Sequence, residues 1–238
     1  PTQVCLTNDN VYEIVNNRVE ELFNENPDYN VISVSQDDNT SYCQCDKCEI
    51  LHDKFGGPSA SMVSFVNRIS ENFKNKTIST LAYQYTRQPS TVIPNQNVLI
   101  TLCSIECDRR IPIDEGCKDF YDDLKGWSKL TDNIRIWDYT TQFTNFLAPF
   151  PNWNTIQPNI NLFYENNAKW IFQQHSRNPS ELFELRSYVM AKLLWDPNLS
   201  FETLVKDFCE KYYGNASEYI IRYVNDISNE IRKETDFF

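Results

Sequence analysis

Residues 97–108 read Asn-Val-Leu-Ile-Thr-Leu-Cys-Ser-Ile-Glu-Cys-Asp, a β-branched and apolar run that passes directly into a polar, cysteine-containing segment. The run 97–103 predicts a short buried strand, and the residues after it predict the loop at the strand's carboxyl end. Four similar runs predict further strands at residues 30–35, 77–83, 133–138 and 168–172. Because helical patterns separate most of these runs, we expect right-handed crossovers and a mainly parallel sheet. The fold class is α/β.

The helices are predicted from apolar residues at helical spacing. The first stripe follows Asn8, a good N-cap, and comprises Val11, Ile14, Val15, Val19, Leu22 and Phe23. Further stripes lie at residues 62–73, about 116–130 and 155–166, and three more at 182–193, 201–212 and 219–231 follow the last strand. We expect a barrel-like portion over residues 1–195 and a helical extension over residues 196–238 that packs on it.

Composition excludes several classes of protein. With 238 residues, 28.0 kDa and 41% hydrophobic residues, the chain is long and apolar enough for a globular core. The 22 Lys and Arg against 33 Asp and Glu give a net charge of −11, which opposes phosphate attraction, so we expect no nucleic-acid partner. No apolar run approaches the roughly 18 residues of a membrane-spanning helix. Because the chain begins at Pro1 without a signal segment, we expect it to be a processed or excised piece.

Ligands of parallel α/β proteins bind beyond the carboxyl ends of the strands, so residues at these ends are the first candidates for a site. They are acids, amides and aromatics: Gln36, Asp37, Asp38, Tyr83, Gln84, Glu106, Trp137, Asp138, Tyr139, Gln173 and Gln174. Aromatic faces stack on sugars, amides and carboxylates bind hydroxyl groups, and a carboxyl pair can hydrolyse a glycosidic bond. The mixture therefore indicates a carbohydrate site.

Each of these residues also has a structural explanation. Asp37 and Asp38 could simply end a strand, and Asp138 could cap the next helix. Glu106 is the stronger candidate, because its apolar neighbours could raise the pKa of a catalytic carboxyl group. Trp137 and Tyr139 belong to an aromatic-rich stretch that could serve core packing, yet they are the preferred residues for stacking on a sugar.

Cysteines form the other local signal. Cys43, Cys45 and Cys48 lie within six residues, and Cys107 follows another predicted strand. These four thiols could bind structural zinc, although disulfides between the loops are the alternative that the single Cys-x-x-Cys spacing favours. His52 and His175 are the only histidines, so catalytic metal sites built on histidine lack ligands.

Several blocks of the sequence resemble the domain of unknown function 4838 family, which is grouped with TIM-barrel glycoside hydrolases. The resemblance rests on Cys5-Leu6-Thr7-Asn8, Val34-Ser35-Gln36 through Cys43-x-Cys45-x-x-Cys48, Gly56-Gly57-Pro58-Ser59, Leu81-Ala82-Tyr83-Gln84-Tyr85-Thr86, Leu102-Cys103-Ser104-Ile105-Glu106-Cys107, Ile136-Trp137-Asp138-Tyr139, and Glu184-Leu185-Arg186-Ser187-Tyr188 through Leu193-Leu194-Trp195. It implies that the five strands are the later strands of a (β/α)₈ barrel similar to alpha-glucuronidases. It also implies that Asp38 and Glu106 stand where such barrels place catalytic carboxyls. A missing N-terminal barrel segment, or another chain, is then expected as a partner.

The sequence departs from the family's pattern at two strand ends. Relatives read Ser-Gln-Asn-Asp where this chain has Gln36-Asp37-Asp38, and Phe-Glu-Gln-Gly where it has Phe172-Gln173-Gln174-His175. The second change replaces a carboxylate by an amide, which can still bind a sugar hydroxyl but cannot exchange a proton.

The leading hypothesis is a glycoside hydrolase in which Asp38 is the general acid, Glu106 the general base or nucleophile, and Asp138 a substrate-orienting group. No cofactor is required. An acidic sugar would need a cationic clamp, for which Arg109, Arg110 and Arg87 are candidates. The alternatives are a non-catalytic carbohydrate-binding protein and a barrel fragment that is inactive without its missing strands. The expected location is extracellular or periplasmic.

Overall fold

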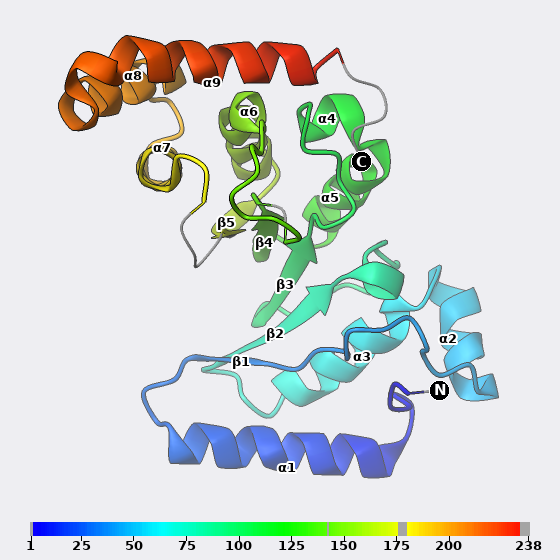
Figure 1. Ribbon diagram of the computed structural model, residues 1–238. Coiled ribbons are helices and arrows are strands. Elements are labelled where there is room, and N and C mark those ends of the chain that lie inside the picture. The colour runs from blue at the N-terminus through cyan, green and yellow to red at the C-terminus, as the bar shows by residue number, and fades with distance from the viewer. Residues whose placement is uncertain (1, 142, 176–179, 234–238) are drawn as a thin grey trace. The chain divides into compact units, whose positions relative to one another are not determined.

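The computed structural model describes residues 2–141, 143–175 and 180–233. Within them, five strands form one sheet in the order β1-β2-β3-β4-β5 (Figure 1). The strands are β1 (Val31–Ser33), β2 (Thr77–Ala82), β3 (Val98–Cys103), β4 (Ile134–Tyr139) and β5 (Ala168–Gln174). Pairing is parallel from β1 to β4, and β5 adjoins β4. The predicted α/β class, with parallel β/α units of a partial barrel, is confirmed.

Helices separate the strands and continue beyond them. They are α1 (Asp9–Glu25), α2 (Asp46–Phe55), α3 (Ser59–Ser70), α4 (Ile113–Gly116), α5 (Lys118–Leu130) and α6 (Trp153–Glu165), with a short 3₁₀ turn, η1 (Gln84–Thr86). The C-terminal helices are α7 (Phe183–Trp195), α8 (Phe201–Tyr212) and α9 (Ser217–Ile231), preceded by the turn η2 (Gly214–Ala216). The three helices at the C-terminus are confirmed. Helix α2 was not predicted, because the cysteine-rich segment at its start has too few apolar residues to show helical spacing.

The chain divides into two compact units. The first comprises residues 1–103, 122–137 and 167–170, and the second comprises residues 104–121, 138–166 and 171–238. In the first unit, α1 and α3 lie along the strands (Figure 1) and bury Val19, Phe23, Phe65, Val66 and Ile69. The side chains of α5 that are buried in this unit are Asp123, Leu124 and Trp127.

The core of the second unit is built from α6 to α9. Its buried members include Trp153, Ile156, Ile160, Leu185, Val189, Leu193, Leu204, Val205 and Val224. On α6 and α7 these residues recur every three or four positions, so one apolar stripe of each of these two helices is withdrawn from water. This core includes side chains that precede Trp195 and side chains that follow it. The domain boundary expected between residues 195 and 196 stays a prediction.

Two kinds of side chain occupy alternate positions of the strands in the first unit. Ile32, Ile78, Ile100 and Ile134 are buried apolar residues. Thr101 and Arg135 are partners in register on β3 and β4, and the Arg135 Nε donates to the Thr101 Oγ1 at 3.0 Å. Strand side chains alternate between faces, so one face of the sheet is apolar and the other carries polar groups.

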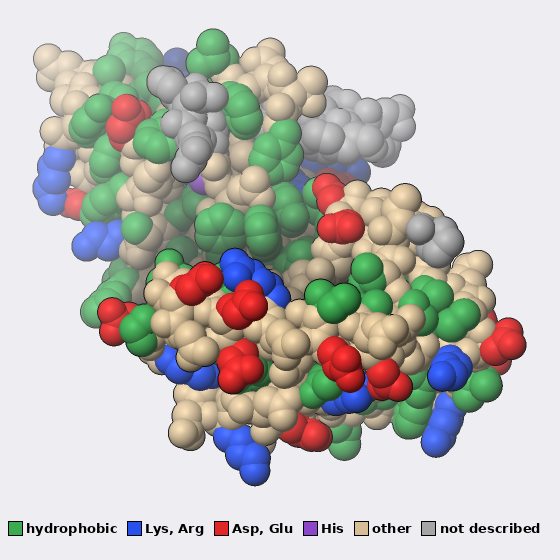
Figure 2. Space-filling model, turned by 90° about the horizontal axis from the view of Figure 1, so that it is seen from below, with side chains coloured by type: hydrophobic (Ala, Val, Ile, Leu, Met, Phe, Trp, Pro, Cys, Tyr) green, Lys and Arg blue, Asp and Glu red, His purple; other side chains and the backbone are tan. Residues whose placement is uncertain are grey.

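The surface agrees with the composition. On the face drawn in Figure 2, acidic and basic side chains are interspersed, without a broad basic patch. No helix of the described residues is long and apolar enough to cross a bilayer.

Substitution of Gly126 tests the packing of α5. A Cβ at this position would lie 2.5 Å from the Pro89 Cγ. Gly to Ala inside a helix normally stabilises by about 0.5–1 kcal/mol, but overpacking costs about 1–3 kcal/mol. We expect Gly126→Ala to lower the free energy of unfolding, measured by urea denaturation. The control is Ser128→Ala, which removes only a bond to the Lys125 carbonyl on the same helix and should change stability by less than about 0.5 kcal/mol. Stabilisation by Gly126→Ala would contradict this packing.

Candidate functional site

Asp38 lies in the loop after β1 with its side chain exposed. Its Oδ1 accepts hydrogen bonds from the Tyr83 hydroxyl at 3.0 Å and from the Gln84 Nε2 at 3.1 Å. Gln84 has a φ of 49°, a left-handed conformation that non-glycine residues rarely adopt and that is often found at functional sites. Three predicted site residues are thus brought together at the ends of two neighbouring strands.

The residues next to Asp38 are fixed by the N-terminal segment and by η1. The Gln36 Nε2 donates to the Tyr83 carbonyl at 2.9 Å and to the Thr86 Oγ1 at 2.7 Å. The Gln3 amide donates to the Asp37 carbonyl at 2.8 Å and accepts from the Asp37 N–H at 3.0 Å. Gln36 therefore holds the loop to η1, while the exposed carboxylate of Asp37 is left on the surface.

Four thiols gather in the same unit. The ligand atoms of Cys5, Cys43, Cys45 and Cys48 all lie within 4.8 Å of one another, and this group could hold a metal ion. The Cys48 backbone N–H and the Thr7 hydroxyl lower the pKa of Cys45 to about 6, whereas burial raises the pKa of Cys48 to about 12.

The fourth cysteine of this cluster is Cys5 rather than Cys107. Cys107 belongs to the second unit, where a hydrogen bond with Cys117 and burial raise the pKa of its thiol. All eight cysteines lie in the described residues and none forms a disulfide, so the disulfides favoured by the spacing are not observed.

Asp138 is the buried carboxylate of the second unit, with 6% of its surface exposed. Its Oδ1 accepts from the Ser104 hydroxyl at 2.8 Å, and its Oδ2 accepts from the Gln173 Nε2 at 3.2 Å. The Ser104 Oγ also accepts from the Tyr139 N–H at 3.3 Å. Both carboxylate oxygens are therefore held by donors from β5 and from the segment after β3.

Arg109 binds main-chain carbonyl groups. Its guanidinium donates to the carbonyls of Ser104 at 2.9 Å, Ile105 at 2.8 Å and Tyr139 at 3.0 Å, and also to that of Cys107. The other two arginines considered for an acidic sugar are paired as well, Arg110 with Asp108 at 2.5 Å and Arg87 with Asp123 at 2.7 Å. Arg109 thus holds the segment after β3 against the end of β4.

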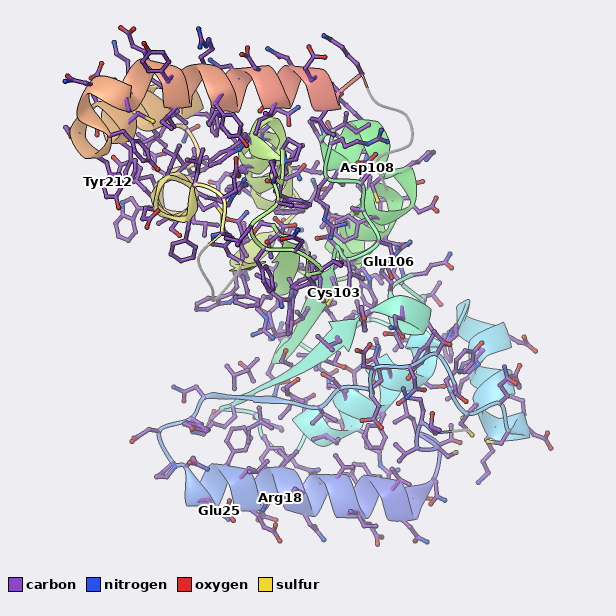
Figure 3. The ribbon with its side chains drawn as sticks, viewed as in Figure 1. Arg18, Glu25, Cys103, Glu106, Asp108 and Tyr212 are labelled. Atoms are coloured by element: carbon purple, nitrogen blue, oxygen red, sulfur yellow. The ribbon has the colours of Figure 1, made fainter. Side chains whose placement is uncertain are left out.

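Figure 3 shows Cys103 at the end of β3, and Glu106 and Asp108 in the segment between β3 and α4. The Glu106 side chain is exposed, as is the neighbouring Ile105, at 36%. The apolar enclosure expected around Glu106 from its sequence neighbours is therefore not observed.

The aromatic candidates on β4 have different surroundings. Trp137 is half-buried and pairs in register with Cys103. Tyr139, also half-buried, meets Phe143 edge to face with ring centroids 6.0 Å apart, and the Arg109 Cζ lies 5.9 Å from its ring centroid. On β5, the Gln174 carbonyl accepts from the Thr140 N–H at 3.1 Å, which links the ends of β4 and β5.

Each unit contains a cavity near these residues. In the second unit, a cavity of about 10 Å³ is lined by Ser104, Arg109, Asp138, Tyr139 and Asn152 among others, which is room for about one water molecule. In the first unit, a groove of about 410 Å³ runs between α1, α3 and β1 and reaches Gln36 and Asp37. Most of the remaining lining of this groove is apolar.

Residues 1–225 match the family described as Domain of unknown function (DUF4838). The chain belongs to this family. A comparison with curated proteins gives no match. Membership in DUF4838 confirms the family that the motifs resemble, and the description of the family assigns no activity.

Arg186 is the main buried residue of this DUF4838 chain that sequence reasoning gave no role. It is 2% exposed, donates to the Phe150 carbonyl at 2.9 Å and to the Asn152 Oδ1, and pairs with Glu181 at 3.2 Å. Its guanidinium lies 3.9 Å from the Trp153 ring centroid. The sequence does place this arginine within the apolar stripe of α7. Because a buried charge needs specific partners, that position could have indicated a structural role for Arg186.

The stability of the second unit should depend on pH through His175. Burial, and then the charge of Arg186, lower the pKa of His175 to about 4 from 6.5, and its ring stacks on Phe183 at 5.0 Å. Between these pH values the unfolded chain binds a proton that the folded chain does not. The free energy of unfolding should therefore fall as the pH decreases from about 6.5 to about 4, and this contribution is fully present above about pH 6.5.

Urea denaturation of the wild type and of His175→Phe across this pH range provides the measurement. The variant keeps an aromatic ring for the stack but has no titrating group, so its stability should depend less steeply on pH. Equal slopes for the two proteins would contradict the assignment.

Proposed function

We propose that this DUF4838 chain is a glycoside hydrolase, acting on the O-glycosyl bond of an oligosaccharide or polysaccharide. Strand-end residues supply its carboxyl groups. The proposal requires no cofactor, because two carboxyl groups suffice for general acid catalysis and for either nucleophilic attack or activation of water.

One repeated feature carries the proposal. Asp38 in the first unit and Asp138 in the second each accept a hydrogen bond from the amide nitrogen of a glutamine, Gln84 and Gln173 respectively. The Oε1 atoms of both glutamines are buried, and no donor among the described residues reaches them. A buried acceptor without a partner is costly, and a sugar hydroxyl group is a donor that would satisfy it. The pairing of a carboxylate with an amide whose acceptor is unpaired therefore supports the proposal of a polyhydroxylated ligand.

The roles follow from the surroundings of each group. Asp38 is exposed in the loop after β1 and is proposed as the general acid. Glu106 is exposed in the segment after β3 and is proposed as the general base or nucleophile. Asp138 has both oxygens occupied by donors, which suits a group that orients substrate. Trp137 and Tyr139 are proposed to stack on sugar rings, and Asp37, Tyr83 and Gln174 to bind hydroxyl groups.

Activity is tested by presenting the full-length protein with a panel of chromogenic glycosides, including glucuronides, and with polysaccharides. On any substrate that is turned over, Asp38→Asn and Glu106→Gln should each lower kcat by about 10²–10⁴-fold, because an amide cannot transfer the proton. The anomeric configuration of the first product, read by NMR, distinguishes an inverting from a retaining reaction.

Two matched variants control for the loss of a surface carboxylate. Asp28→Asn in the first unit and Asp114→Asn in the second change exposed aspartates outside the proposed site and should leave kcat within about twofold. Full activity in both Asp38→Asn and Glu106→Gln would remove the proposed carboxyl pair.

A carbohydrate-binding protein without turnover is the second candidate, and Gln173 is the observation that favours it. The group held against Asp138 is an amide, which binds hydroxyl groups but transfers no proton. Calorimetric binding of an oligosaccharide to the full-length protein, without product after prolonged incubation, would select this function. Turnover that disappears in Glu106→Gln would select the hydrolase.

A further inference from the structure

The four-thiol cluster combines three segments of the first unit. Cys5 comes from the segment before α1, Cys43 and Cys45 come from the loop after β1, and Cys48 lies in the first turn of α2. The side chains range from exposed at Cys45 to buried at Cys48. Thiols that are 38 residues apart in sequence are therefore gathered at one point.

Two of the distances between the sulfur atoms are close to those of a tetrahedral metal site, and all four sulfurs lie within 4.8 Å of one another. Four sulfurs at about 2.3 Å from a central Zn²⁺ would be about 3.8 Å from one another. The Cys5 Sγ lies 3.7 Å from the Cys45 Sγ and 3.9 Å from the Cys48 Sγ. A disulfide would instead require about 2.05 Å.

Polar groups surround the sulfur atoms. The Thr7 hydroxyl lies 3.2 Å from the Cys5 sulfur and 3.4 Å from the Cys48 sulfur. Because Cys45 is the N-cap of α2, the cluster also faces the positive end of the helix dipole. Such donors around the ligands are typical of metal–thiolate centres.

We propose that Cys5, Cys43, Cys45 and Cys48 bind one Zn²⁺ as a tetrathiolate centre. Four protein ligands leave no open position, so the centre is structural and takes no part in the reaction. It fastens the N-terminal segment to the loop after β1, and the Gln3 bonds to Asp37 and Asn39 fasten the same two segments a few residues away. The metal thereby holds the loop that carries Asp38. This inference does not depend on the proposed function.

The first measurement uses the full-length protein purified without chelator. Elemental analysis should find one Zn²⁺ per chain bound by this cluster, and reconstitution with Co²⁺ should give the absorption bands of a tetrahedral tetrathiolate site. Chelation should release the zinc and make four additional thiols reactive. Hydrogen exchange should then increase in residues 2–8 and 36–48 and remain unchanged in α8.

Variants identify the ligands. Cys45→Ser and Cys5→Ser should each lower the zinc content by at least about tenfold after dialysis against a weak chelator. Cys117→Ser, a partly buried cysteine of the second unit, should retain the full content. Cys45 is exposed, so its substitution introduces no buried polar group.

Three results would overturn the proposal. The first is a disulfide among the four cysteines, detected by mass spectrometry of the non-reduced protein. The second is a protein that contains no zinc and has four reactive thiols without chelation. The third is full zinc content in both Cys5→Ser and Cys45→Ser. Because all the readouts are zinc, thiols and hydrogen exchange, a protein without glycosidase activity can still pass this test.

Discussion

Parallel pairing of β1 to β4 holds Ile32 opposite Ile78 and Ile100 opposite Ile134. All four side chains are buried, so the register is set by apolar area removed from water. Slippage of one strand by a single residue would exchange its two faces and bring a polar side chain into the apolar layer. Since the strands are parallel, the same register also places their carboxyl ends at one edge of the sheet. The candidate site residues were chosen because they directly follow these carboxyl ends in the sequence.

The polar face of the sheet has its own internal order. The Arg135 guanidinium donates to the Thr101 Oγ1 at 3.0 Å and to the Ser79 Oγ at 3.3 Å, and the two hydroxyls lie 3.2 Å apart. Burial lowers the pKa of Arg135, which means that the position is costly for a charge. Hydroxyl groups on two adjacent strands offset part of that cost. A polar face of this kind cannot serve as a second packed core, so helices pack on the other face.

Elements with strong periodicity could be predicted from the sequence, and contacts between distant segments could not. The five strands and the three C-terminal helices followed from short β-branched runs and from helical stripes. By contrast, α2 begins within Cys45-Asp46-Lys47-Cys48, where few apolar residues mark a helix. Cys43, Cys45 and Cys48 were recognised by spacing alone, but Cys5 joins them only because the N-terminal segment folds back onto the loop after β1. Glu106 was expected to be enclosed by its apolar neighbours, yet burial depends on the whole fold, and its side chain is exposed.

Asp38 and Asp138 illustrate how similar residues acquire different chemistry. Both carboxylates accept a hydrogen bond from the side-chain amide of a glutamine. Asp138 is 6% exposed and receives a second donor, Ser104, on its other oxygen, so both of its carboxylate oxygens are held in place. Asp38 is exposed, and both of its donors bind the single oxygen Oδ1, which leaves Oδ2 to face solvent or a ligand. A proton donor needs such an accessible oxygen, whereas a positioning group needs a fixed one. The difference arises from burial and donor geometry rather than from the identity of the residue.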